Sequence, residues 1–164
     1  MKEEINLFEY TEKGKYAPKP ELPYITRENV ALIIKYANQY LFLSWNEVQY
    51  QKSLVTGGID SNEAREKAIK REIEEETGYY DIEVIIPVDG INVSKFYVEH
   101  KKENRKAIYY PYLVILKTLN SKLVAKSEQE QHACVWYDEK ELDKVDLFEN
   151  HRYMLNKALE QIEK

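Results

Sequence analysis

Short apolar runs separated by polar and turn residues cover most of the chain and predict a fold built mainly from strands. The first clear run is 29–36, where the consecutive apolar residues 30–34 are typical of a buried strand. Residues 40–45 are its expected hairpin partner across Ala37-Asn38-Gln39. The long alternating run 107–119 predicts the strongest strand of the sheet. Further strands are predicted at 53–56, 82–88, 92–98 and 133–137.

Helical spacing of apolar residues is confined to a central segment and the end of the chain. The central helix is expected to begin at Ser61 or Asn62, either of which is a suitable N-cap, and to end at Thr77. Glu63 would then lie in the first turn, and Gly78 supplies the C-terminal stop. Further helices are predicted at 139–142 and 150–162.

The order of these segments predicts a mixed α/β layer fold, in which strands surround one central helix and another helix closes the chain. Pro18, Pro20 and Pro23 interrupt regular pairing, so residues 1–26 are expected to be a lead-in and 27–164 the domain. Within the lead-in, 5–10 is interpreted as a short edge strand or a dimer contact. The polar stretch 100–106 is predicted to be a loop.

Composition narrows the class of protein. The length of 164 residues and the 43% hydrophobic content fit one globular domain. The net charge of −5, from 29 acidic and 24 basic side chains, argues against a nucleic-acid or anionic-membrane surface. No apolar run approaches 18 residues, and 1–4 is not expected to open a signal or transit peptide. With Cys134 as the single cysteine, we expect a reducing, cytoplasmic compartment.

An acidic cluster at the end of the central helix is the first sign of chemistry. Glu72, Glu75 and Glu76 fall within roughly a third of the helix circumference. Like charges at these spacings destabilise a helix by about a few tenths of a kcal/mol per pair, and the helix dipole disfavours anions at that end. Arg71 is the only basic residue within the last turn and a half of this helix. A divalent cation with oxygen ligands would reverse the effect, whereas a solvated helix face is the plain alternative.

The segment from Gly57 to Tyr79 reads GGIDSNEAREKAIKREIEEETGY. It resembles the Nudix signature, G-x5-E-x7-R-E-U-x-E-E-x-G-U, in which U is a bulky apolar or aromatic residue, and it fills every defined position. Many Nudix signatures carry Gly just before the first Glu, where this chain has Asn62. That difference removes no signature carboxylate.

The resemblance implies a mixed sheet sandwiched between helices, with the signature as a loop–helix–loop. It also implies an enzyme that uses Mg²⁺ or Mn²⁺ to cut a pyrophosphate bond. By position in the signature, Arg71 would hold the carboxylates in place, and Glu63 would support or contact the metal site. The general base would be Glu72 or Glu76. The implied metal ligands are the carbonyl of Gly57 and the side chains of Glu72, Glu75 and Glu76.

Residues beyond the signature supply further candidates. Many Nudix proteins draw an extra carboxylate from the loop before the late strand, which here is Glu128 or Glu130, although two solvated glutamates would look the same. His132 is a further candidate for the site, whereas a lone histidine is more often a surface or packing residue. Tyr97, Arg105 and Trp136 are candidate substrate contacts. The alternatives are an exposed hairpin tip for Arg105 and ordinary core packing for the two aromatic residues.

The leading hypothesis is a pyrophosphohydrolase acting on a small phosphorylated substrate, such as a nucleotide, dinucleoside polyphosphate or nucleotide sugar. The alternatives are a hydrolase of a non-nucleoside diphosphate, such as an isoprenoid diphosphate, and a Nudix-fold ligand sensor without turnover. A homodimer is expected by analogy with many Nudix hydrolases. Residues 96–97 and 104–105 also give a looser likeness to Nudix domains joined to some leucyl-tRNA synthetases.

Overall fold

A mixed sheet of nine strands organises the computed structural model, which describes residues 7–46 and 51–163. Its centre is β2 (Tyr24–Tyr36), which pairs in parallel with β8 (Glu103–Leu116). On its other edge β2 pairs first with β5 (Val55–Gly58) and then with β3 (Gln39–Trp45), both antiparallel. The other strands are β1 (Leu7–Thr11), β4 (Lys52–Ser53), β6 (Ile82–Pro87), β7 (Ile91–Val98) and β9 (His132–Asp138). The α-helices are α1 (Arg65–Thr77), α2 (Lys126–Gln131) and α3 (Glu149–Ile162), and the 3-10 turns are η1 (Gly14–Tyr16), η2 (Glu99–Lys101) and η3 (Glu139–Lys144).

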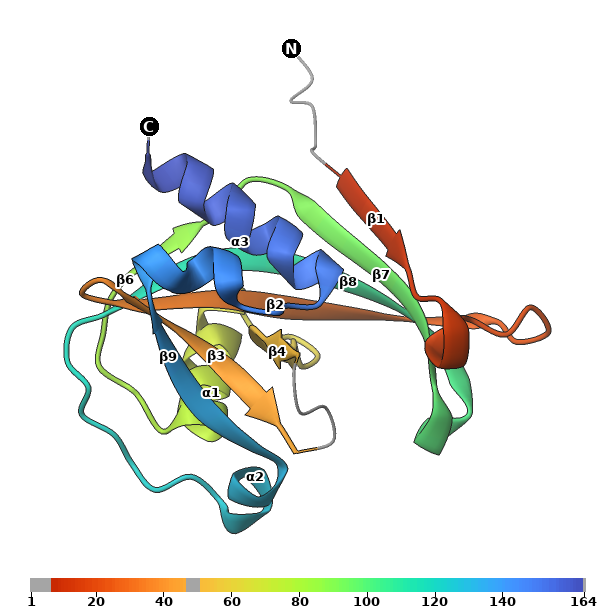
Figure 1. Cartoon of the computed structure of the whole chain (residues 1–164). Helices are drawn as coiled ribbons and strands as arrows, with labels where there is room; N and C mark the ends of the chain where they lie inside the picture. The colour runs from red at the N-terminus through yellow and green to blue at the C-terminus, as the bar shows by residue number, and fades with distance from the viewer. Residues whose placement is uncertain (1–6, 47–50, 164) are drawn as a thin grey trace.

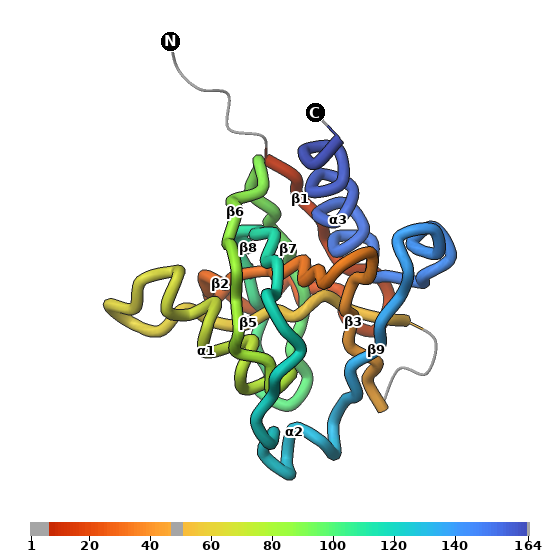
Figure 2. The backbone as a smooth tube through the Cα atoms, turned by 90° about the vertical axis from the view of Figure 1, so that its left-hand side faces the viewer, coloured from red at the N-terminus to blue at the C-terminus, as the bar shows by residue number. Residues whose placement is uncertain are grey.

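The helices α1 and α3 lie against opposite faces of the sheet (Figures 1 and 2). Successive side chains of β2 point to opposite faces, so its continuous apolar run feeds two cores. Ala31 and Ile33 pack in one buried cluster with Met154 of α3, whereas Leu32 packs in the other with Ile69 of α1. This arrangement confirms the predicted mixed sheet between helices. No helix in the described part of the chain is long and apolar enough to cross a membrane.

The predicted loop at 100–106 is wrong, the central strand β2 begins at Tyr24 rather than at residue 29, and helix α2 was not predicted. The segment 100–106 is not a loop, because the turn is confined to η2 and to Lys102, which has a φ of 50°, and β8 begins at Glu103. The polar residues after the turn remain in register with β7, since the Asn104 side chain is buried and bonds backbone groups of Lys19 and Leu22. Helix α2 was missed because its six residues carry no apolar stripe.

The lead-in contributes a strand to the sheet. β1 pairs in parallel with β7 at the sheet edge, from Leu7 opposite Ile91 to Thr11 opposite Lys95. The Phe8 ring stacks on Tyr153 of α3 with a centroid distance of 3.9 Å. The edge strand expected at 5–10 is therefore confirmed from Leu7 onward, and residues 5 and 6 lie outside the described residues. The division of the chain at residues 26 and 27 stays a prediction.

Candidate active site

The turn before α1 is set by Asn62 and Glu63. Helix α1 begins at Arg65, so the predicted start at Ser61 or Asn62 is wrong. Asn62 has a φ of 63°, a left-handed conformation that ends regular helix and that Asn adopts more readily than most residues. It thus keeps the turn that glycine forms there in many Nudix signatures. Glu63 precedes the helix, and its Oε1 accepts the backbone N–H of Asp60 at 3.1 Å.

Arg71 ties this turn to the carboxylates of α1. Its Nε and one terminal nitrogen donate to the two oxygens of Glu63, both at 2.9 Å. That terminal nitrogen also donates to the Gly58 carbonyl at 2.9 Å, and the other one donates to Glu72 at 2.7 Å and Glu75 at 3.4 Å. The Arg71 hydrogen bonds, aided by the Asp60 N–H, lower the pKa of Glu63 to about 2. Glu63 is therefore a fixed anion that orients Arg71.

Glu72 and Glu76 form the buried part of the acidic cluster. Glu72 is 8% exposed and lies so close to Gly57 that a Cβ at Gly57 would overlap its carboxylate. Burial raises the pKa of Glu72, against the opposing effect of Arg71. Burial, followed by the charges of Glu128, Glu72 and Glu75, raises the pKa of Glu76 to about 8. Glu75 lies at the rim, with its side chain 54% exposed.

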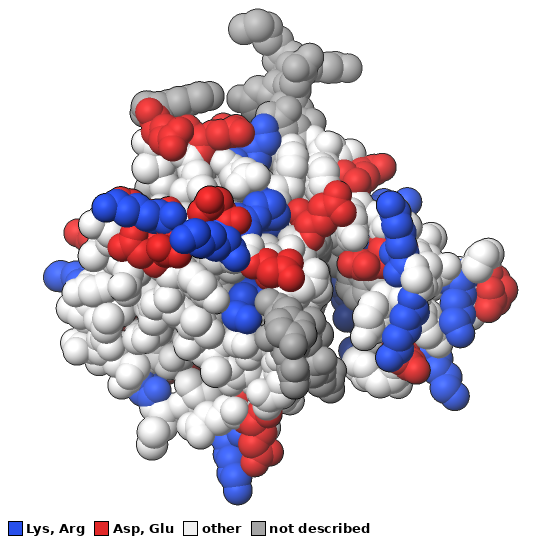
Figure 3. Space-filling model, in the orientation of Figure 1, with Lys and Arg blue, Asp and Glu red and all other residues white. Residues whose placement is uncertain are grey.

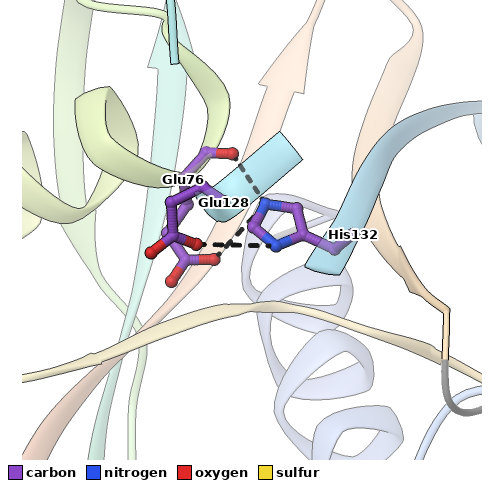
Figure 4. Close-up of side chains that lie close together, drawn as sticks. All are labelled: Glu76, Glu128 and His132. Carbon is purple, nitrogen blue, oxygen red and sulfur yellow. Dashed lines mark hydrogen bonds and ion pairs between the residues drawn. The ribbon is translucent and has the colours of Figure 1, made fainter. Parts of the chain in front are cut away.

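Helix α2 and β9 bring two further groups to Glu76 (Figure 4). His132 Nε2 lies 2.9 Å from the backbone carbonyl of Glu76 and 3.7 Å from its Oε2. His132 Nδ1 lies 3.7 Å from Glu128 Oε2. Of the two candidate loop carboxylates, only Glu128 joins this cluster, because Glu130 is 67% exposed and faces Lys126 at 4.0 Å.

The three predicted substrate contacts lie in different parts of the molecule. Tyr97 packs beneath Lys19, whose Nζ is 4.4 Å from the ring centroid. Trp136 donates from Nε1 to the hydroxyl of Tyr79 at 3.3 Å, in the core on the α1 side. Arg105 lines a cavity of about 610 Å³ together with Gly58 and Asp60 of the signature loop. Of the three, Arg105 is therefore the one that shares a cavity with the signature.

A cavity beside the acidic cluster was not predicted from the sequence. It has a volume of about 380 Å³ and is lined by Trp45, Thr56, Ser94, Phe96, Tyr109 and Asn150, among others. Thr56 precedes Gly57 in β5, and the Trp45 ring contacts His132 at a centroid distance of 4.8 Å, so two lining residues neighbour residues of the acidic site. Its walls come from well-separated segments, and neither their spacing nor any local motif marks them as neighbours.

Comparison with models of known protein families shows to which family the chain belongs. The model of the NUDIX domain family matches residues 24–158. The chain belongs to the Nudix family. It thus has the domain of the Nudix hydrolases, enzymes that act on pyrophosphate bonds. A search of curated proteins found no match.

Solved structures with the Nudix fold are similar to the chain at low sequence identity. The MutT Nudix hydrolase of Burkholderia pseudomallei has 22% identity and a TM-score of 0.61, over 81% of this chain and 98% of that one. The NUDIX domain of Shewanella oneidensis NrtR, solved with ADP ribose, has 12% identity and a TM-score of 0.65, over 88% and 93%. The E. coli dihydroneopterin triphosphate pyrophosphohydrolase has 14% identity and a TM-score of 0.62, over 79% and 92%. At these identities the likeness concerns the fold.

The donor groups of this Nudix site fit a divalent cation. Oε2 of Glu76 is buried without a hydrogen-bond partner among the described residues. Burial, followed by the negative charges of the neighbouring carboxylates, raises the pKa of Glu76. Glycine at position 57 leaves the backbone close to Glu72, where a larger residue would not fit. Carboxylate and carbonyl oxygens are the ligands that hard divalent cations prefer. A cation bound here would also offset the repulsion between the carboxylates.

Proposed function

We propose that this Nudix enzyme is a Mg²⁺- or Mn²⁺-dependent pyrophosphohydrolase that cleaves a diphosphate linkage in a nucleoside diphosphate derivative. The observation that carries the proposal is the convergence of Glu72, Glu76 and Glu128 at the end of the signature helix. All signature carboxylates are present, which favours an enzyme with turnover over a ligand sensor.

The metal would be held by carboxylate and carbonyl oxygens of the signature. When bound, a divalent cation neutralises the diphosphate and lowers the pKa of the attacking water. Arg71 and Glu63 act as positioning residues, since their mutual hydrogen bonds fix the loop and orient the carboxylates of Glu72 and Glu75. The proposed ligands are the carbonyl of Gly57 and the side chains of Glu72, Glu75, Glu76 and Glu128.

The general base is assigned to Glu72 or Glu76. Both carboxylates are largely removed from solvent, and burial raises the pKa of each, which favours uptake of a proton from the attacking water. Glu75 is more than half exposed at 54%, so it lacks this environment. Arg71 pairs with Glu72 at 2.7 Å and stabilises the ionised carboxylate, the form that can accept a proton.

The cavity of about 380 Å³ is the proposed site for the nucleoside part of the substrate. Tyr109 and Phe96 provide ring surface for stacking, and Asn150 and Thr56 provide polar groups at the wall. Arg105 is the proposed contact for an anionic part of the substrate, because its cavity includes the signature loop. Tyr97 and Trp136 stay weaker assignments, since their contacts are those of packing residues.

Neither a nucleic acid nor a membrane is proposed as a partner. Figure 3 shows Lys and Arg beside Asp and Glu on one face of the molecule, where a nucleic-acid surface would be predominantly basic. A cytoplasmic location and a homodimer belong to the proposal as well, the first because Cys134 is a single cysteine.

The test is a hydrolysis screen in Mg²⁺ and in Mn²⁺. Its panel holds nucleoside triphosphates, ADP-ribose, dinucleoside polyphosphates, nucleotide sugars and isoprenoid diphosphates. We expect cleavage of a nucleoside-containing compound and a loss of at least about a hundredfold in the Glu76→Gln and Glu75→Gln variants, because each removes a proposed ligand.

Glu130→Gln is the matched control, because Glu130 is a surface carboxylate of the same helix as Glu128. Its activity should equal that of the unmodified enzyme. Full activity in both Glu75→Gln and Glu76→Gln would contradict the assigned site. Cleavage of isoprenoid diphosphates alone would instead support the non-nucleoside alternative.

A further inference from the structure

His132 presents a nitrogen without a hydrogen-bond partner to the acidic cluster. Its Nε2 lies 2.9 Å from the carbonyl oxygen of Glu76, and a carbonyl only accepts, so Nε2 carries the proton. In a neutral imidazole, Nδ1 then holds a lone pair. The side chain is 2% exposed, and Nδ1 has no hydrogen-bond partner in the described part of the chain.

This lone pair points toward other electron-pair donors. Glu128 Oε2 lies 3.7 Å from Nδ1, and the buried Oε2 of Glu76, also unpartnered within the described residues, belongs to the same group. The ligand atoms of Glu76, Glu128 and His132 all lie within 4.8 Å of one another. Figure 4 shows the two carboxylates on the side of the ring that bears the nitrogens. Three such atoms repel each other unless a cation lies between them.

We propose that Nδ1 of His132 is a metal ligand, which together with Glu76 and Glu128 forms a mixed nitrogen–oxygen site that favours Mn²⁺ over Mg²⁺. This inference rests on the proposed function, because Glu76 is shared with the signature ligands. Imidazole nitrogen suits transition-metal ions, whereas Mg²⁺ prefers oxygen donors throughout. Ligand atoms about 2.1 Å from one ion lie roughly 3 to 4 Å apart, and Nδ1 lies 3.7 Å from Glu128 Oε2.

The surroundings of His132 hold the ring in this orientation. The Glu76 carbonyl fixes Nε2, and the Trp45 ring packs against the imidazole at 4.8 Å. Trp45 is itself fixed, because its Nε1 donates to Ser53 Oγ at 2.7 Å and its backbone lies opposite His132 in the β3–β9 pair. An imidazole ligand in proteins is commonly oriented by a carbonyl on its second nitrogen, which is the role of Glu76 here.

The decisive measurement is pulsed electron paramagnetic resonance of Mn²⁺ added to the full chain. We expect modulation from a directly bound ¹⁴N nucleus in the unmodified protein. In His132→Gln, the amide still reaches the Glu76 carbonyl but has no lone pair at the Nδ1 position. The nitrogen signal should disappear, and Mn²⁺ affinity should fall about tenfold or more, while Mg²⁺ affinity in competition changes less than about threefold.

His100→Gln is the matched control, since His100 lies on the exposed turn η2, and it should keep both the signal and the affinity. Bound Mn²⁺ without nitrogen modulation in the unmodified protein would overturn the inference. This measurement uses the unmodified protein, so it tests the inference even if His132→Gln does not fold. Retained Glu76-dependent hydrolysis would then show that the proposed function survives, whereas no Mn²⁺ binding and no hydrolysis would contradict both.

Discussion

His151, at the start of α3, shows how one buried side chain sets a pH limit on stability. Its Nδ1 accepts the N–H of Leu54 at 3.0 Å, and burial lowers its pKa from 6.5 to about 4. Between these values the unfolded chain binds a proton that the folded protein does not. The free energy of unfolding should therefore fall as the pH drops from 6.5 to 4, by up to about 3 kcal/mol from this group.

The check is urea unfolding at pH 7 and pH 4.5 for the unmodified protein and for His151→Asn. Asn offers an oxygen acceptor near the position of Nδ1 and does not titrate in this range. The unmodified protein should lose more stability between the two pH values than the variant does. Equal losses in both proteins would show that His151 does not carry the effect.

Among the elements, α1 depends on the turn that ends it. Gly78 has a φ of 82°, and a Cβ there would collide with the backbone carbonyl of Lys122. Gly78→Ala should therefore lower the free energy of unfolding by about 3 kcal/mol, since it combines a left-handed backbone with a backbone clash. Gly14→Ala is the control, because Gly14 also has a positive φ, 67°, but has open space around it. That variant should lose only about 1 kcal/mol. If chemical denaturation gives similar losses in the free energy of unfolding for the two variants, the clash between the new Cβ at position 78 and the Lys122 carbonyl is relieved by local movement.

Elements with a clear apolar period could be predicted from the sequence, and those shaped by distant contacts could not. The runs around Val30–Ile34 and the alternation after Ala107 report burial directly, so the central strands were predicted. The start of α1 was misplaced because Glu63 is engaged by Arg71, eight positions away, and the early start of β8 depends on Asn104 contacts with Lys19 and Leu22.

The same distinction applies to the site. Spacing within one helix placed Glu72, Glu75 and Glu76 together, and the structure has them together with Arg71. The contact of His132 with Glu76 spans 56 positions and depends on the short helix α2, which has no apolar signal. The walls of the neighbouring cavity likewise meet only through the sheet and α3.

For the whole molecule, metal removal should leave the fold intact, because both apolar cores are independent of the carboxylates. Excess Mn²⁺, at about a hundred times its Kd, should stabilise the protein by about 3 kcal/mol and raise the Tm by roughly 5–10 °C. Glu76→Gln should lose most of that shift. The measurement is thermal unfolding with EDTA, Mg²⁺ or Mn²⁺. Complete unfolding with EDTA alone would mean that the metal is structural, which contradicts the proposed role.

Two adjacent residues of β5 point to opposite sides of the sheet: Gly57 meets Glu72, and Thr56 lines the cavity. The proposed metal-binding groups and the proposed substrate-binding groups thus lie on opposite sides of one strand. Evolution can then alter one set without disturbing the other. An ancestral enzyme of this design could change what it recognises by exchanging side chains on the Thr56 side, while inheriting its reaction unchanged through the Gly57 side.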